Sequence, residues 1–206
     1  RLCRPFSGGG CDFGEMIMDF TGKIRSYYKT LINIIENLDV GQLNEAMNVL
    51  YDAYERESDV YICGNGGSAA TASQFQNDFN KGVCYDLPKK FHFRCLNDNV
   101  ATMMAIANDD SYEKVFSKQL EGNIKKNDVL VAISGSGNSK NIIAACEEAK
   151  KAGAKIIGVS GYDGGRLYEL SDYHMHCGIK NMQIVEDVHM TFDHMMMSVF
   201  CELLNK

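Results

Sequence analysis

The sequence predicts an α/β protein in which helices cover both faces of a parallel, five-stranded sheet. Short apolar runs alternate with helical patterns from residue 59 onward, which is typical of a parallel sheet between two helical layers. The run at 129–133 is continuously apolar and rich in β-branched residues, as expected for a strand buried on both faces. Three of the strands run into Gly/Ser-rich loops, and open parallel sheets bind their ligands beyond these carboxyl ends.

The first 57 residues precede this pattern. Residues 1–15 contain Pro5 and three consecutive glycines, show no periodicity and lack the apolar core of a signal peptide, which predicts a disordered leader. Apolar residues then recur at helical spacing over 19–38 and 41–56, so 16–57 is predicted to form a helical hairpin. The first of these helices has more apolar residues than packing on its own sheet requires, which suggests subunit contacts. These residues are Ile24, Tyr27, Tyr28, Leu31, Ile34, Ile35 and Leu38.

The remaining residues, 58–206, are predicted to form the αβα core, so that 16–206 is a single domain. Five short apolar runs bounded by turn residues are predicted as strands, at 60–63, 91–95, 129–133, 155–159 and 173–177. Helical spacing predicts helices at 69–81, 100–107, 112–123 and 141–152, and Gly153 marks a helix stop. Residues 184–204 are predicted to close the chain as one long helix. Acidic residues and histidines occupy its first half, and methionines follow.

Composition and charge exclude several classes of partner. The formal charge is -6 and no basic cluster occurs, so neither nucleic acid nor an anionic membrane is expected to bind. No apolar stretch approaches the ~18–20 residues needed to span a bilayer. The eight cysteines form no Cys-x-x-Cys pair, and several lie in apolar runs. Reduced thiols in a soluble, cytoplasmic protein are therefore expected.

The loop at 134–139 is predicted to bind an anion. It places three serine hydroxyls and a flexible backbone at the start of a helix, where free N–H groups and the helix dipole favour negative charge. It lacks the Gly-Lys-Ser/Thr ending of a Walker motif and the third glycine of a dinucleotide loop, which favours a small phosphorylated ligand. An ordinary turn with capping serines is the alternative. Two further loops, at 64–68 and 160–165, are expected to lie in register with it.

Five ordered motifs together resemble the sugar isomerase (SIS) domain family, and within it the phosphoheptose isomerases. The motifs are Cys63-Gly-Asn-Gly-Gly-Ser-Ala69, Asn108-Asp109, Ile133-Ser-Gly-Ser-Gly-Asn-Ser139, Gly161-Tyr-Asp-Gly-Gly165 and Glu186-Asp-Val-His189 with His194. The likeness covers residues 16–206. It implies a flavodoxin-like, three-layer αβα sandwich that assembles as a homotetramer and binds a sugar phosphate.

The resemblance also implies which residues form the site. The family's phosphate-binding serines correspond to Ser68, Ser134, Ser136 and Ser139. Its positions around the sugar correspond to Asn65, Gly66, Gly67, Asp109 and Glu186. Its zinc ligands, which are His, Glu, Gln and His, correspond here to Gln74, Asp78, Glu186 and His194.

The altered metal positions leave the cofactor open. A side-chain amide such as that of Gln74 is a weak zinc ligand, so manganese, another divalent ion or no ion are alternatives to zinc. Glu186 and His194 are eight residues apart, which is a rise of ~12 Å along a helix. Both are expected to reach one ion only if Glu186 lies at or before the start of the last helix.

The activity that the resemblance implies is isomerisation of sedoheptulose 7-phosphate to D-glycero-D-manno-heptose 7-phosphate, the first step towards nucleotide-activated heptose. Such an isomerase moves a proton between neighbouring carbons through an enediolate, which requires a base, an acid and stabilisation of an oxyanion. Asp78 stands at the family's base position and His194 at its acid position. Two alternatives are a non-catalytic, phosphosugar-sensing protein resembling the DnaA initiator-associating protein, and an isomerase of another phosphosugar.

Other polar residues have a simpler interpretation. Gln74 and Asp78 would also suit a solvated helix face, and His189 with Asp193 is expected to form a surface pair. The remaining histidines are predicted to lie at strand edges or on the surface, and they are His92, His174 and His176.

Overall fold

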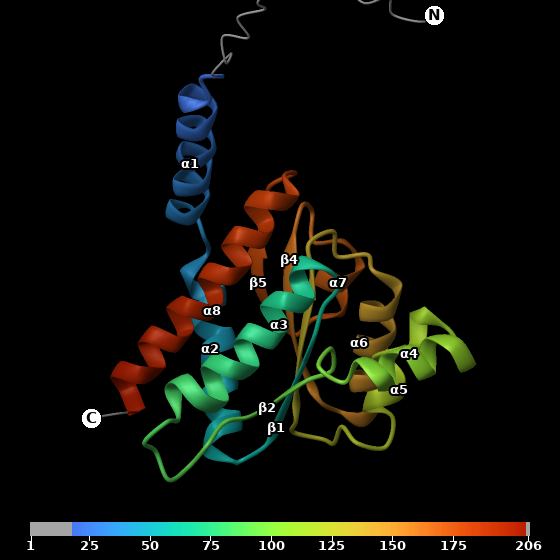
Figure 1. Cartoon of the computed structure of the whole chain (residues 1–206). Helices are drawn as coiled ribbons and strands as arrows, with labels where there is room; N and C mark the ends of the chain where they lie inside the picture. The colour runs from blue at the N-terminus through green and yellow to red at the C-terminus, as the bar shows by residue number, and fades with distance from the viewer. Residues whose placement is uncertain (1–17, 205–206) are drawn as a thin grey trace, which may run out of the picture.

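A parallel five-stranded sheet forms the centre of the protein (Figure 1). The computed structural model describes residues 18–204, so the predicted leader at 1–15 lies outside the described residues. The strands lie in the order β2-β1-β3-β4-β5, and every neighbouring pair is parallel. They are β1 (Asp59–Cys63), β2 (His92–Cys95), β3 (Val129–Ser134), β4 (Lys155–Gly161) and β5 (Tyr173–Cys177). The predicted sheet is confirmed, with every strand end within about two residues of its expected position, the usual scatter of such boundaries.

Helices cover both faces of the sheet, which confirms the three-layer sandwich (Figure 1). One layer contains α2 (Val40–Glu55), α3 (Gly67–Asn77) and α8 (Met182–Leu204). The other contains α5 (Ser117–Leu120), α6 (Lys140–Ala152) and α7 (Gly165–Leu170). Gly153 ends α6 in the left-handed conformation, as a helix-stop glycine does. Within residues 18–204, no helix combines the length and the apolar character that crossing a membrane requires.

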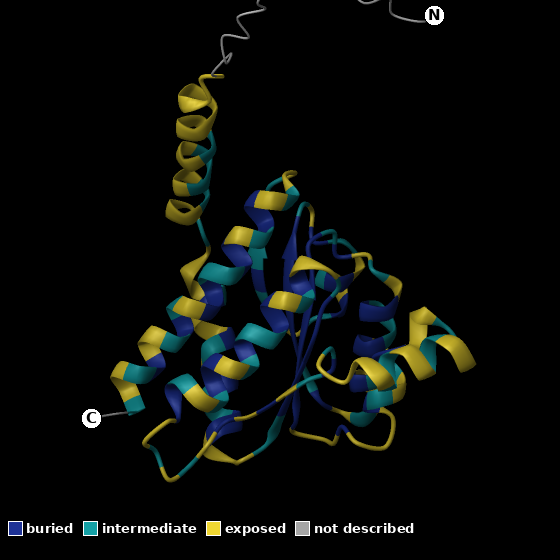
Figure 2. Ribbon diagram, viewed as in Figure 1, coloured by how far each residue is buried: buried dark blue, intermediate teal, exposed yellow. Residues whose placement is uncertain are grey.

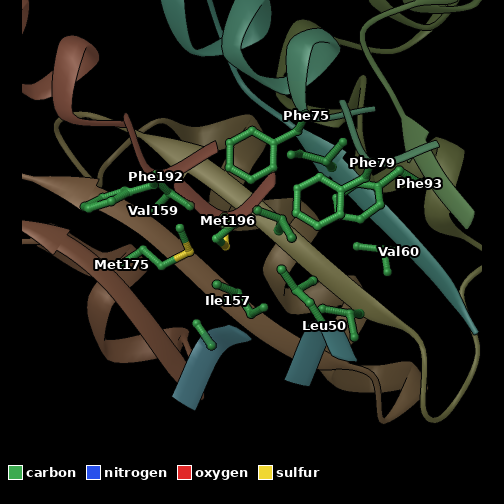
Figure 3. Packing of buried hydrophobic residues seen from close by; sticks show 14 of the residues in the cluster. Leu50, Val60, Phe75, Phe79, Phe93, Ile157, Val159, Met175, Phe192 and Met196 are labelled. Carbon is green, nitrogen blue, oxygen red and sulfur yellow. The ribbon is translucent and has the colours of Figure 1, made fainter. Parts of the chain in front are cut away.

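The apolar core lies on both sides of β3, in which every residue is buried. On the α3 and α8 side, aromatic rings pack together, and the Phe79 and Phe93 ring centroids are 4.5 Å apart (Figure 3). Phe116 and Leu120 belong to the second cluster, on the α6 side. Figure 2 shows the buried residues concentrated along the strands and on the helix faces that cover them. The sheet is therefore covered by apolar side chains on both faces.

Two predicted helices differ from the structure. The helix expected at 69–81 ends at Asn77 and continues as one π-helical turn, Asp78–Val83. This wider turn buries Phe79 and Val83 in the same core. The helix expected at 112–123 is divided into a 3₁₀ turn, Tyr112–Lys114, and the short α5. π-helical turns are rare and frequently occur at functional sites.

The two N-terminal helices form where they are expected, but they do not close into a packed hairpin. α1 (Thr21–Glu36) projects from the body of the molecule (Figures 1 and 2). It has no buried residue, and Ile24, Tyr28 and Ile32 are more than half exposed. The Tyr27 hydroxyl donates a hydrogen bond of 2.5 Å to Asp187 of α8. Tyr27, Leu31 and Ile34 are half-buried against the core, so within one chain only part of the apolar face of α1 is covered.

Candidate functional site

A cavity of about 270 Å³ lies where the loops after β1 and β3 meet the start of α8. The predicted phosphate serines all line it, and so do the glycine turn after β1 and Glu186. Its lining residues that were predicted for the site are Asn65, Gly66, Gly67, Ser68, Ser134, Ser136, Ser139 and Glu186. The two loops are therefore in register, as parallel strands require. Met182 is a lining residue that sequence reasoning missed.

Two glycines allow the backbone of the cavity to approach its neighbours closely. A Cβ atom at Gly67 would overlap the carboxylate of Glu186, so the backbone at the start of α3 packs directly against the Glu186 side chain of α8. Gly137 has φ +68°, a conformation that favours glycine. A Cβ atom there would overlap the carbonyl oxygen of Gly164 in the loop after β4. Gly137 thus joins the β3 and β4 loops by direct backbone contact.

The serines are arranged around the start of α6. The Ser134 hydroxyl lies 3.2 Å from that of Ser139, which is the N-cap residue of α6. Ser139 makes no side-chain capping bond to the helix, so its hydroxyl is not used in an ordinary N-cap. The Ser136 hydroxyl accepts a hydrogen bond from the backbone N–H of Asn138. Hydroxyls at a helix start that do not cap the helix are well suited to bind a phosphate.

A polar network holds Asn65 at the edge of the cavity. Its side chain exchanges hydrogen bonds of 2.8 Å with Asn141 of α6. The Tyr112 hydroxyl donates a further 2.8 Å bond to the side-chain oxygen, Oδ1, of Asn65. Neither Asn141 nor Tyr112 was predicted, and no sequence signal places them here, because the contact depends on how α6 and the 3₁₀ turn pack beside the β1 loop.

Asp109 is not brought to the cavity. It is the last residue of α4 (Val100–Asp109), it is exposed, and it accepts a hydrogen bond from the neighbouring Asn108 amide. It does not belong to the residues that line the cavity. α4 itself has no buried residue, so nothing in the described part of the chain fixes Asp109 towards the sugar.

The predicted base and acid lie next to each other on neighbouring helices. The His194 Nε2 atom of α8 is 3.9 Å from the Asp78 Oδ2 atom. The other oxygen of Asp78 accepts hydrogen bonds from the amide nitrogens of Gln74 and Asn77, at 2.9 and 3.0 Å. Asp78 is buried, so the solvated-face interpretation is wrong for this residue. Gln74 positions the carboxylate with its amide nitrogen.

Asp193 and His189 are not the surface pair that the sequence suggested. Both are buried, with 0% and 1% of their surface exposed, because the face of α8 that carries them packs against α3 and the sheet. Burial, reinforced by the neighbouring Asp78, raises the pKa of Asp193 to about 7. Ligand atoms of Asp78, Asp193 and His194 all lie within 4.8 Å of one another. Asp193 was missed because carboxylates are mostly exposed.

The cavity and the Asp78–His194 pair are separate within one chain. Neither residue lines the cavity, and the 11 residues of α3 that separate Gly67 from Asp78 span ~16 Å. α8 begins at Met182, so Glu186 lies inside this helix and the condition for sharing an ion with His194 is not met. Glu186 is instead a cavity residue.

The other histidines have structural roles. His176 lies on β5, at the edge of the sheet, and its Nδ1 atom is 3.0 Å from the Ser160 hydroxyl. The His174 ring stacks on Tyr168 at 3.8 Å between centroids. His92 is exposed on the opposite edge strand, β2. Their predicted places at sheet edges are confirmed.

We expect His189 to make the protein sensitive to acid. Burial lowers the pKa of His189 to about 4, whereas an unfolded histidine titrates near ~6.5. The unfolded state therefore binds more protons between these values, and stability is lost as the pH falls through this window. Between pH 7 and pH 5 the loss is about 2 kcal/mol. In urea unfolding at both pH values, His189→Gln should reduce this loss.

The matched control for that experiment is His92→Gln, which removes an exposed imidazole from β2. It should leave the difference between pH 7 and pH 5 close to that of the unsubstituted protein. If His189→Gln and His92→Gln behave alike, burial of His189 is not the cause of the acid sensitivity.

Comparison with known proteins assigns this chain to a family. The model of the SIS domain family matches residues 26–161. Because this match covers more than half of the chain, the chain belongs to the SIS domain family.

Its relatives within that family are phosphoheptose isomerases. The phosphoheptose isomerase of Helicobacter pylori (strain ATCC 700392 / 26695) is 34% identical over 165 residues, which are 80% of this chain and 83% of that protein. The phosphoheptose isomerase of Campylobacter concisus (strain 13826) is 34% identical over 175 residues, which are 84% of this chain and 89% of that protein. The solved structure of a phosphoheptose isomerase from Francisella tularensis has a TM-score of 0.82 and 26% identity, covering 90% of this chain and 100% of that one. The resemblance that the motifs indicate is confirmed.

Proposed function

We propose that the protein is a cytoplasmic phosphoheptose isomerase, which converts sedoheptulose 7-phosphate to D-glycero-D-manno-heptose 7-phosphate. The observation that carries this proposal is the combination of a serine-lined cavity at two helix starts with the pair formed by Asp78, in the π-helical turn after α3, and His194 of α8. The cavity supplies recognition of a phosphate, and the pair supplies proton transfer. Relatives more than 30% identical to this chain carry this name.

In the proposed reaction, the serine hydroxyls and the N–H groups at the starts of α3 and α6 hold the phosphate. Asp78 removes a proton from C1 of the ketose, which leaves an enediolate across C1 and C2. The proton returns at C2, while His194 moves a proton from the oxygen on C1 to the oxygen on C2. The amides of Gln74 and Asn77 bind Oδ1 of Asp78 and leave Oδ2, which faces His194, for the reaction.

A divalent ion such as zinc fits part of this arrangement. Asp78 and His194 offer a carboxylate and an imidazole, which are ligands that zinc takes readily. An ion held there would polarise the substrate carbonyl. Gln74 directs its amide nitrogen at Asp78, so in this arrangement it supports a ligand and does not act as one.

We further propose that the chain works as a homotetramer. The exposed apolar side chains of α1 support this assembly, and so does an apolar hollow of about 410 Å³ between α1, α2 and α8. The hollow is lined chiefly by Ile35, Leu38, Val40, Leu43, Met47, Phe192, Met195 and Val199. In an oligomer, the Asp78–His194 pair of one subunit can face the serine cavity of another, which removes the ~16 Å separation along α3.

The direct test is turnover of sedoheptulose 7-phosphate in deuterated water, with zinc, with manganese and after chelation. We expect the aldose product to form and to carry deuterium at C2, because the proton passes through a solvent-exchanging side chain. Phosphorus and proton NMR would detect both. A protein that binds the sugar phosphate but converts none of it under any of the three conditions would contradict the isomerase proposal.

That negative result would favour a phosphosugar-sensing function, which the same fold supports equally well. The observation behind this second candidate is that Gln74 and Glu186 depart from the family's ligand types. A sensor would bind the sugar phosphate tightly and would capture a protein partner only in the presence of that ligand.

A further inference from the structure

We propose that Asp193 binds a divalent cation together with Asp78 and His194. This set differs from the four positions that the family resemblance implies, since Asp193 replaces Glu186 and Gln74 becomes a supporting residue. The inference deepens the proposed function, because Asp78 and His194 are its base and acid. It identifies a ligand that no motif of the family contains.

The state of Asp193 is the first observation. Its side chain is completely buried, and neither carboxylate oxygen has a hydrogen-bond partner within residues 18–204. A carboxylate that is buried without a hydrogen-bond partner is unfavourable. Asp78, the nearest acidic group, is also buried and has the same charge, so it adds repulsion. A cation between the two carboxylates would remove both penalties.

The geometry of the three side chains is the second observation. Their ligand atoms lie within 4.8 Å of one another. Bonds of ~2.0–2.2 Å from zinc to oxygen or nitrogen place the ligands of one ion ~3–4 Å apart. Side-chain movements of about 1 Å therefore bring this group to coordination distance. The Gln74 and Asn77 amides hold Asp78 from the side, as supporting residues of a metal ligand do.

The position of Glu186 supports the same ligand set. Its carboxylate lies against Gly67 at the serine cavity, and it precedes Asp193 by seven residues of α8, or ~10 Å of helix rise. Glu186 is therefore placed beside the sugar phosphate, while Asp193 faces the π-helical turn that begins at Asp78. Two carboxylates and one imidazole suit zinc or manganese and carry enough charge to retain either ion.

The test measures binding of the ion without substrate. Chelator-treated protein is titrated by calorimetry with zinc chloride, and separately with manganese chloride, at a fixed pH. Asp193→Asn should lower the affinity for whichever ion binds more tightly by at least ~100-fold. Such a loss exceeds the effect of replacing most residues that only support a ligand. Glu186→Gln should bind as the unsubstituted protein does, and so should Glu202→Gln, which removes an exposed carboxylate from the same helix.

Thermal unfolding gives a second readout. In the metal-free protein, Asp193→Asn should raise the melting temperature, because it removes an acidic side chain that is buried beside Asp78. With the ion present, the unsubstituted protein should gain stability and the variant should not. If Asp193→Asn folds poorly, Asp193→Ser replaces it, since serine also removes the carboxylate and is smaller; it too should weaken ion binding.

Two outcomes would overturn the proposal. In the first, Asp193→Asn binds both ions as tightly as the unsubstituted protein. In the second, Glu186→Gln loses binding while Asp193→Asn retains it, which would restore the family's ligand set. Turnover of sedoheptulose 7-phosphate is measured separately on the same samples. Tight ion binding through Asp193 without turnover would therefore contradict the isomerase and leave the cation site standing.

Discussion

Asp78→Asn is expected to lower kcat for sedoheptulose 7-phosphate by about 10³-fold, within the range of a positioned general base. The substitution keeps the shape of the side chain, but an amide cannot remove the C1 proton. Asp78 does not line the serine cavity, so binding of the sugar phosphate should persist. Steady-state kinetics and calorimetry with the sugar phosphate would measure the two effects separately.

Asp98→Asn is the matched control for that substitution. Asp98 also accepts hydrogen bonds from α3, from Ser73 and Gln76, but it lies outside the group formed by Asp78, Asp193 and His194. Asp98→Asn should leave kcat within a few-fold of that of the unsubstituted protein. Asp78→Glu keeps the carboxylate and should therefore retain more activity than Asp78→Asn. Equal losses for Asp78→Asn and Asp98→Asn would show that the effect is structural and not catalytic.

The same substitution tests whether the site is shared between subunits. Oligomers assembled from a mixture of Asp78→Asn and Ser134→Ala chains should recover part of the lost activity if the pair of one subunit serves the cavity of another. Chains that remain inactive when mixed, although they co-assemble, would place the whole reaction within one subunit.

Gly137→Ala is expected to produce the second large effect, on both stability and affinity. The left-handed φ of +68° costs an alanine ~1–2 kcal/mol. The added Cβ atom also overlaps the backbone of Gly164, and relief of such overpacking costs a further ~1–3 kcal/mol. Because this contact holds the β3 loop in place, the serines should move and the dissociation constant for the sugar phosphate should rise at least ~10-fold.

Gly122→Ala separates these two causes. Gly122 has nearly the same φ, +75°, but a Cβ atom there meets nothing within 4 Å. Its substitution should therefore lower the free energy of unfolding by only about 1 kcal/mol and leave the affinity unchanged. If urea unfolding gives the same loss for both variants, the contact between Gly137 and Gly164 does not hold the cavity together.

The serine loops show how much of the site the sequence contains. Ser68, Ser134, Ser136 and Ser139 follow strands whose apolar runs identify them, and parallel strands bring their carboxyl ends to one edge of the sheet. Local pattern and sheet geometry together therefore predict the cavity. Asp109 was expected from a motif alone, with no strand to place it, and it lies elsewhere.

The residues proposed for metal binding and proton transfer show where sequence reasoning stops. Helical spacing brought Gln74 and Asp78 to one face of α3, but it could not tell that this face meets α8 at a π-helical turn. It also assigned Asp193 to the surface, because the residues that α8 packs against, Asp78 among them, are not its neighbours in the sequence.

By itself, the sequence determined the sheet, its two helical layers, the family and the position of the serine cavity, since each depends on local periodicity or on loops that directly follow strands. Only the tertiary structure decided that α1 projects from the body, that Asp193 and His189 are buried, and that Asp78 lies far from the serines within one chain. The physical reason is that burial and charge pairing depend on which helix faces meet, and that choice is made by the packing of the whole chain around β3.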